Sequence, residues 1–206
     1  MNSIERAAYH AELVDWLSAA DWLGFITLTH KIHRPADWFF TRMDRLGSLL
    51  SSNHGIGFEW AASIEKTKNG VNHLHAPFRC PGYTGELLKA GSKVFPTDWI
   101  KRQHAPAHKL SRVVNAIHRV SNTGVEGFDA QSSKEGLQKL RNTHLQLYDY
   151  IGFWYQGNYG CMADTASIRS QEGVVSYALK YAMKDIDQPK LTWMVSKRAI
   201  PVIGLH

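Results

Sequence analysis

The stretch IGFEWAASIEKTKNGVNHLHAPFR, residues 56–79, predicts a β-hairpin. Its first half alternates between two faces, one with Phe58, Trp60, Ala62 and Ile64 and the other with Glu59, Ala61, Ser63 and Glu65. Strict alternation is typical of a strand, and Asn69-Gly70 is a strong signal for a hairpin turn. Residues 71–79 are therefore expected to return as a second, antiparallel strand.

His73 and His75 lie in the returning strand, separated by Leu74. Because side chains alternate along a strand, the two imidazoles share one face, with their Cα atoms about 6–7 Å apart. Pairing across the turn brings Glu65 close to His73. The pattern predicts a metal site with two nitrogen ligands and one oxygen ligand, and Glu59 is the alternative carboxylate on the same face. The competing interpretation is a pair of polar groups on a sheet surface.

The rest of the chain predicts further strands and helices around this hairpin. We expect helices over residues 3–20 and 36–50, strands over 25–30, within 160–170 and at 191–198, and a helix capped by Ser170. Residues 80–142, broken by glycine and proline, predict a helical insertion. The aromatic-rich residues 145–159 are expected mainly in the core, with base stacking as the alternative. We therefore predict an α+β fold, a central antiparallel sheet flanked by helices, in a single domain over residues 1–206.

The chain has a formal net charge of +6, with 11 histidines besides. This balance favours a polyanionic partner and salt-sensitive binding. The candidate contacts to a DNA backbone are Lys101, Arg102, Lys109, Arg112, Lys197 and Arg198. A solvated basic surface is the alternative, because clustered cations give no finer signature of phosphate binding.

The sequence has no apolar run long enough to cross a bilayer, and residues 1–6 lack the core of a signal peptide. We therefore expect a cytoplasmic protein with no membrane partner. Cys80 and Cys161 form no CxxC pair, so they are expected to be thiols rather than zinc ligands or a disulfide.

The helix after Ser170 is expected to have two different faces. One half holds Val174, Val175, Ala178, Leu179, Ala182 and Met183, and the opposite half holds Tyr177, Lys180, Tyr181 and Lys184. Neighbouring ammonium groups favour the phenolate form of a tyrosine, which is the stronger nucleophile. Two tyrosines one turn apart could reach one site alternately, and the alternative is an amphipathic helix with surface tyrosines.

Three ordered motifs make the chain resemble the HUH endonuclease superfamily, specifically its rolling-circle replication initiators with two active-site tyrosines, such as the gene A proteins of small single-stranded DNA phages. The motifs are Phe25-Ile26-Thr27-Leu28-Thr29, His73-Leu74-His75 and Tyr177-Ala178-Leu179-Lys180-Tyr181-Ala182-Met183-Lys184. The resemblance covers residues 25–184. It implies a Rep nuclease fold with a ferredoxin-like or RRM-like core, in which the central sheet carries the histidines and a helix presents the tyrosines.

The resemblance also implies a chemistry. A tyrosine attacks a phosphodiester of single-stranded DNA, stays joined to the 5′ end and releases a 3′ hydroxyl that primes synthesis. The implied roles are nucleophile for Tyr177 and Tyr181, stabiliser of phosphate or phenolate for Lys180 and Lys184, and metal ligand for His73 and His75, with Glu65 added from the hairpin register. Such a donor set suits Mg²⁺ or Mn²⁺, and Zn²⁺ could bind the same residues.

The expected partner is single-stranded DNA or an origin hairpin, bound by a monomer. No GxxxxGKS/T helicase motif is present, so unwinding would need a separate helicase, and a host polymerase would extend the 3′ end. A plasmid relaxase or a two-tyrosine transposase would use the same chemistry. A protein of a different class, which binds DNA hairpins on this fold without cleaving them, is the other alternative.

Overall fold

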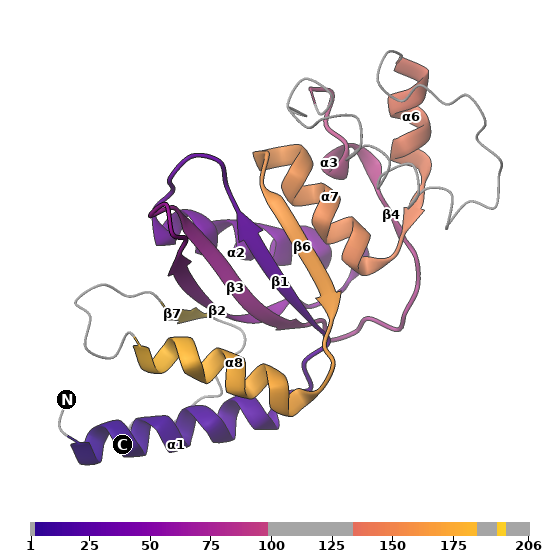
Figure 1. The fold of residues 1–206 in the computed structure, drawn as a ribbon. Coiled ribbons are helices and arrows are strands. Elements are labelled where there is room, and N and C mark those ends of the chain that lie inside the picture. The colour runs from indigo at the N-terminus through magenta and orange to yellow at the C-terminus, as the bar shows by residue number, and fades with distance from the viewer. Residues whose placement is uncertain (1–2, 99–133, 185–192, 197–206) are drawn as a thin grey trace. The chain divides into compact units, whose positions relative to one another are not determined.

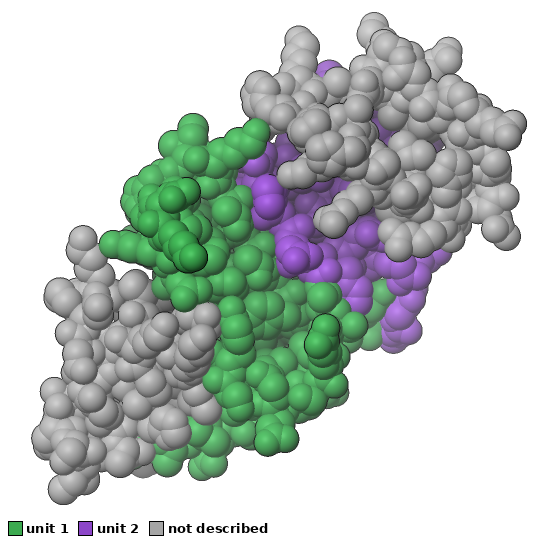
Figure 2. Space-filling model, viewed as in Figure 1, with its two compact units in different colours: residues 1–83, 166–206 green, residues 84–165 purple. Residues whose placement is uncertain are grey.

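The structure, a computed structural model, describes residues 3–98, 134–184 and 193–196. The chain divides into two compact units (Figure 2): unit 1 comprises Met1–Tyr83 and Ala166–His206, and unit 2 comprises Thr84–Thr165. Unit 2 is thus inserted within the sequence of unit 1. Both the predicted metal ligands and the predicted tyrosine helix belong to unit 1.

Unit 1 is built on an antiparallel sheet (Figure 1). Its strands, in spatial order, are β1 (Gly24–Thr29), β3 (Asn72–Arg79), β2 (Glu59–Lys66) and β7 (Trp193–Val195). A further strand, β6 (Met162–Ser167), precedes β1 in the strand order and contains the boundary between the two units. The predicted α+β class, with an antiparallel sheet flanked by helices, is confirmed.

The β2–β3 hairpin has the predicted register, in which Glu65 lies opposite His73. Its turn is closed by a hydrogen bond from the Gly70 N–H to the Thr67 carbonyl oxygen, at 2.9 Å. Gly70 has a φ of 74°, a left-handed conformation that carries no steric penalty in glycine. The turn therefore fixes which residues of the two strands face each other.

Helix α2 (Ala36–His54) covers one face of the sheet (Figure 1). It starts after Pro35, as predicted, and ends at Gly55, which has a φ of 68°. The Phe40 ring stacks on Trp60 of β2, with ring centroids 5.9 Å apart. Other buried side chains of α2 are Phe39, Met43, Leu46 and Leu50. Each large apolar side chain buried here contributes about 1.5–3 kcal/mol to stability.

Helices α1 (Ser3–Ala19) and α8 (Gln171–Lys184) lie side by side on the other face of the sheet (Figure 1). The buried cluster between them and the sheet consists of Leu17, Ala20, Trp22, Ala61, Val174 and Val175. Ser170 caps α8, as predicted, because its Oγ accepts a hydrogen bond from the Gly173 N–H at 3.1 Å. Val174 and Val175 are buried in this cluster, which confirms the predicted apolar face of α8 over its first turn.

Unit 2 contains helices and a small sheet. Among its described residues, the elements are β4 (Leu88–Lys89), α3 (Gly91–Val94), α6 (Lys134–Asn142), β5 (His144–Leu145), which pairs with β4, and α7 (Leu147–Tyr159). Tyr150, Phe153, Trp154 and Tyr155 of α7 are buried, so the core assignment of residues 145–159 is confirmed for these four rings. Residues 99–133, more than half of the expected insertion at 80–142, lie outside the described residues, and that insertion stays a prediction.

Across residues 3–98, 134–184 and 193–196, no helix combines the length and the apolar character needed to cross a membrane. Cys80 and Cys161 are buried thiols, as expected. Burial raises the pKa of the Cys80 thiol to about 12, because a thiolate loses its hydration inside the protein. Cys80 is therefore a packing residue and not a nucleophile near neutral pH.

Candidate active site

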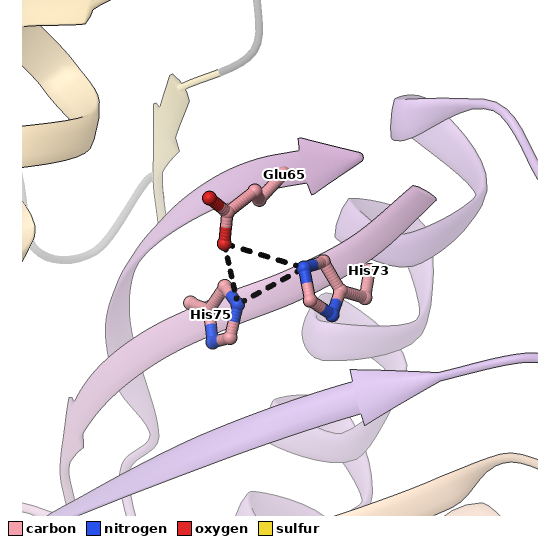
Figure 3. A group of neighbouring side chains, drawn as sticks. All are labelled: Glu65, His73 and His75. Carbon is pink, nitrogen blue, oxygen red and sulfur yellow. Dashed lines mark hydrogen bonds and ion pairs between the residues drawn. The ribbon is translucent and has the colours of Figure 1, made fainter. Parts of the chain in front are cut away.

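Glu65 of β2 and His73 and His75 of β3 converge on one face of the sheet (Figure 3). Glu65 Oε2 lies 3.4 Å from His73 Nε2 and 3.5 Å from His75 Nε2, and the two Nε2 atoms are 3.3 Å apart. The hairpin register and the alternation of strand side chains place all three on the same side. Side-chain exposure rises from 9% at His75 to 19% at His73 and 34% at Glu65, so the group is accessible from solvent.

The three ligand atoms of this group fit a common metal ion. Ligands about 2.1 Å from an ion lie about 3.0 Å apart at adjacent octahedral positions and about 3.4 Å apart in a tetrahedron. The observed separations of 3.3, 3.4 and 3.5 Å are close to these values. Two imidazoles and a carboxylate occupy three positions around an ion and leave others for water or a phosphate oxygen. In the part of the chain that the structure describes, these residues form a group that could hold a metal ion.

The strand on the other side of β3 supplies a further contact to His75. Thr27 of β1 lies opposite His75, and its Oγ1 is 3.1 Å from the imidazole Nδ1. Metal ligation through Nε2 would leave the ring proton on Nδ1, which then donates to Thr27 Oγ1. The hydroxyl of Thr27 is therefore positioned to fix both the orientation and the tautomer of this ring.

The ring of Tyr177 on α8 lies beside the same group. Its centroid is 5.6 Å from that of His75 and 5.0 Å from that of Phe25, and it meets both rings edge to face. Phe25 is itself 6.2 Å from His75, between centroids. Aromatic pairs of this kind are worth about 0.5–1.5 kcal/mol each, which favours this position of the tyrosine ring. A phenol and a metal-ligand set are thus neighbours, although they come from distant parts of the sequence.

Glu59, the alternative third ligand, is engaged elsewhere. Its Oε2 accepts a hydrogen bond from Arg79 Nε at 2.7 Å and lies 2.6 Å from Arg79 Nη2. Glu59 and Glu65 are six residues apart on the same face of β2, which is about 20 Å at the rise of a strand. The structure therefore brings Glu65, and not Glu59, to the histidines.

Glu65→Gln should weaken Mn²⁺ binding by at least about a hundredfold, because an amide lacks the charge that a carboxylate offers a divalent ion. The matched control, Glu59→Gln, should leave the Mn²⁺ dissociation constant unchanged. It should instead lower the free energy of unfolding by about 1–2 kcal/mol, because the hydrogen bond from Arg79 loses its charged acceptor. Calorimetric titration with Mn²⁺ and unfolding in urea measure the two effects. Equal Mn²⁺ affinity in both variants would contradict the assignment of Glu65.

Thr27→Val should weaken Mn²⁺ binding about tenfold, because the His75 ring loses the group that orients it. Valine has nearly the shape of threonine and suits a strand, so the melting temperature should change little. Thr27→Ser keeps the hydroxyl and should restore affinity. The control is Thr29→Val, which removes a hydroxyl from the same face of β1, opposite His73. The role given to Thr27 would be wrong if both valine variants bound Mn²⁺ as tightly as the wild type.

The other predicted site residues are outside what the structure describes at the side-chain level. Lys180, Tyr181 and Lys184 belong to α8, but their side chains are not described. The predicted DNA contacts Lys101, Arg102, Lys109, Arg112, Lys197 and Arg198 lie outside the described residues entirely. The roles given to all of these residues stay predictions.

Two residues of the site, Phe25 and Thr27, had no specific role in the sequence interpretation. Both belong to one motif, and their alternation predicted that they share a strand face. The missing information was the pairing of β1 with β3, which sets Thr27 opposite His75. A motif of three alternating residues beside a metal-binding strand is the signal that could have pointed to them.

Comparison of the chain with models of protein families, with curated proteins and with solved structures gave no match. The class of site is defined by its own residues: a Glu-His-His group able to hold a metal ion, beside a tyrosine, on an antiparallel sheet.

Proposed function

We propose that this chain is a site-specific single-stranded DNA endonuclease of the HUH type that initiates rolling-circle replication. The observation that carries the proposal is the position of the Tyr177 ring, 5.6 Å between centroids from the ring of His75. His75 belongs to the Glu-His-His group, so a potential nucleophile lies next to a set of metal ligands. Metal-assisted transesterification at a phosphodiester uses these two components at one place. The three sequence motifs support the same family.

In this proposal, the hydroxyl oxygen of Tyr177 attacks the scissile phosphorus of the DNA. A phosphorus–oxygen bond forms to the tyrosine, and the bond from phosphorus to the 3′ oxygen breaks. The phenol loses its proton, and the departing 3′ oxygen gains one. The 5′ end stays covalently joined to the protein, which conserves the phosphoester bond and requires no ATP. Tyr181 is the proposed second nucleophile, which would allow the displaced strand to be joined into a circle.

Glu65, His73 and His75 are the proposed ligands of Mg²⁺ or Mn²⁺. A carboxylate with two imidazoles and open positions suits these ions when a phosphate oxygen completes the ligand set. A bound divalent ion would polarise the scissile phosphate and offset the charge that develops on it. The part of Thr27 is to hold the His75 ring with Nε2 toward the carboxylate.

The test is incubation with a single-stranded oligonucleotide that carries the replication origin, in the presence of Mn²⁺. A covalent protein–DNA species should form and survive denaturing electrophoresis, and EDTA should prevent it. Tight binding of origin hairpins without any covalent species in Mn²⁺ would instead identify a DNA-binding protein without nicking activity.

A further inference from the structure

Two connections leave the sheet beside His73, and both are basic. Strand β1 ends at Thr29, opposite His73, and β2 ends at Lys66, one pair further along the hairpin. The segments that follow, residues 30–35 and 67–71, contain no Asp or Glu. The cations of these segments and of the end of β2 are named the basic rim: Lys31, Arg34, Lys66 and Lys68.

No ion pair within the described part of the chain neutralises the charges of the basic rim. Lys31, Lys66 and Lys68 are exposed, and Arg34 is half-buried. The ion pairs found among the described residues involve none of the four. The adjacent carboxylate, Glu65, belongs to the metal-ligand group. Lys31 and Lys68 lie in the connections at the end of the sheet that carries this group. Lys66 alternates with Glu65 along β2, and Arg34 contacts Trp38 of α2, so these two cations lie toward the face that α2 covers.

Local contacts hold the two connections in place. Asn72 Nδ2 donates a hydrogen bond to the carbonyl oxygen of Arg34 at 2.8 Å, and the Thr67 N–H donates to the carbonyl oxygen of Val71 at 2.8 Å. The guanidinium carbon of Arg34 lies 5.3 Å from the centroid of the Trp38 ring, a favourable cation–π arrangement. A preformed surface loses less conformational entropy when it binds a ligand.

We propose that the basic rim binds phosphates of the DNA strand next to the scissile one, where the strand crosses this end of the sheet. The inference rests on the proposed function, which supplies the ligand, and it assigns residues to strand binding that the sequence interpretation left unassigned. Clustered cations bind phosphates and position a strand without reading its bases. Ile32, which is 63% exposed between Lys31 and Arg34, adds an apolar contact for a sugar or a base. In this proposal the basic rim determines the affinity for single-stranded DNA, and Tyr177 performs the nucleophilic attack.

The salt dependence of single-stranded DNA binding tests this surface. The variant Lys31→Ala/Lys66→Ala/Lys68→Ala changes only exposed side chains, so it should fold as the wild type does. Each phosphate contact to a single strand contributes about 0.7 to the slope of log K against log salt concentration, so three lost contacts should reduce the slope by about 2. Fluorescence anisotropy with a labelled oligonucleotide in EDTA measures the slope without cleavage.

The matched control, Arg45→Ala/Lys89→Ala/Arg169→Ala, removes the same charge from exposed positions outside the rim and should change the slope much less. An equal decrease in both variants would overturn the proposal, because it would reflect net charge alone. An unchanged slope in the rim variant would overturn it too. The covalent protein–DNA species tests the proposed function separately. If the wild type bound DNA through the basic rim but formed no such species, the result would support the rim and contradict the proposed nicking activity.

Discussion

Tyr177→Phe should lower the rate of the first DNA cleavage by at least about a thousandfold, because phenylalanine keeps the ring and removes the attacking oxygen. The ring contacts with Phe25 and His75 need no hydroxyl, so the packing of α8 should be retained. Single-turnover cleavage of an origin-bearing oligonucleotide measures the rate, and denaturing electrophoresis measures the covalent species. Mass spectrometry of the digested adduct should locate the DNA on Tyr177.

Two further variants make this result specific to one residue. Tyr159→Phe removes a phenol from α7, outside the site, and should cleave at the wild-type rate. Tyr181→Phe should retain the first cleavage and lose the later joining step. An adduct located on Tyr181 in the wild-type protein would contradict Tyr177 as the first nucleophile. Undiminished cleavage by the Tyr177→Phe/Tyr181→Phe protein would contradict tyrosine chemistry altogether.

The part of the site that the sequence predicted well depends on local structure. Strict alternation and the Asn69-Gly70 turn were sufficient to place Glu65 opposite His73, because a hairpin register follows once the turn is fixed. The same alternation predicted that the side chains of His73 and His75 lie on one face of the strand. No long-range information was needed for any of these contacts.

The boundaries of several elements were predicted less well, for identifiable reasons. The strand predicted over residues 56–66 begins at Glu59, because the Gly57 N–H bonds instead to the carbonyl oxygen of Pro81 at 2.8 Å. The helix predicted over residues 36–50 continues to His54, where Gly55 ends it. Such ends depend on individual hydrogen bonds that periodicity does not encode.

The contact of Tyr177 with Phe25 and His75 could not be predicted from pattern alone. Sequence spacing predicted that Tyr177 faces away from the apolar side of its helix, but not what it faces. Its position depends on how α8 packs, and this is set by tertiary contacts: Gln171 at the start of α8 bonds both the N–H and the carbonyl oxygen of Trp22, at 3.2 and 2.9 Å. The two halves of the site thus meet through packing between distant segments.

His73→Ala/His75→Ala should abolish measurable Mn²⁺ binding and lower the cleavage rate by at least about a thousandfold. Glu65 alone is a weak ligand for a divalent ion, and without the ion the charge that develops on the phosphate is offset less well. The control His33→Ala/His144→Ala removes two exposed histidines outside the group and should retain both metal binding and cleavage. Full cleavage by the first variant would exclude a metal role for His73 and His75.

Metal-dependent stability gives a second measurement of the same variant that needs no DNA. An ion that binds only the folded protein stabilises it by about 2.7 kcal/mol at a concentration one hundred times its dissociation constant. The wild type and the His33→Ala/His144→Ala control should therefore melt at a higher temperature when Mn²⁺ is added, whereas His73→Ala/His75→Ala should not respond. Because each protein is compared with itself with and without the ion, any stability lost through the substitutions cancels. A wild type whose melting temperature is the same at all Mn²⁺ concentrations would argue against a resident metal in the Glu65–His73–His75 group.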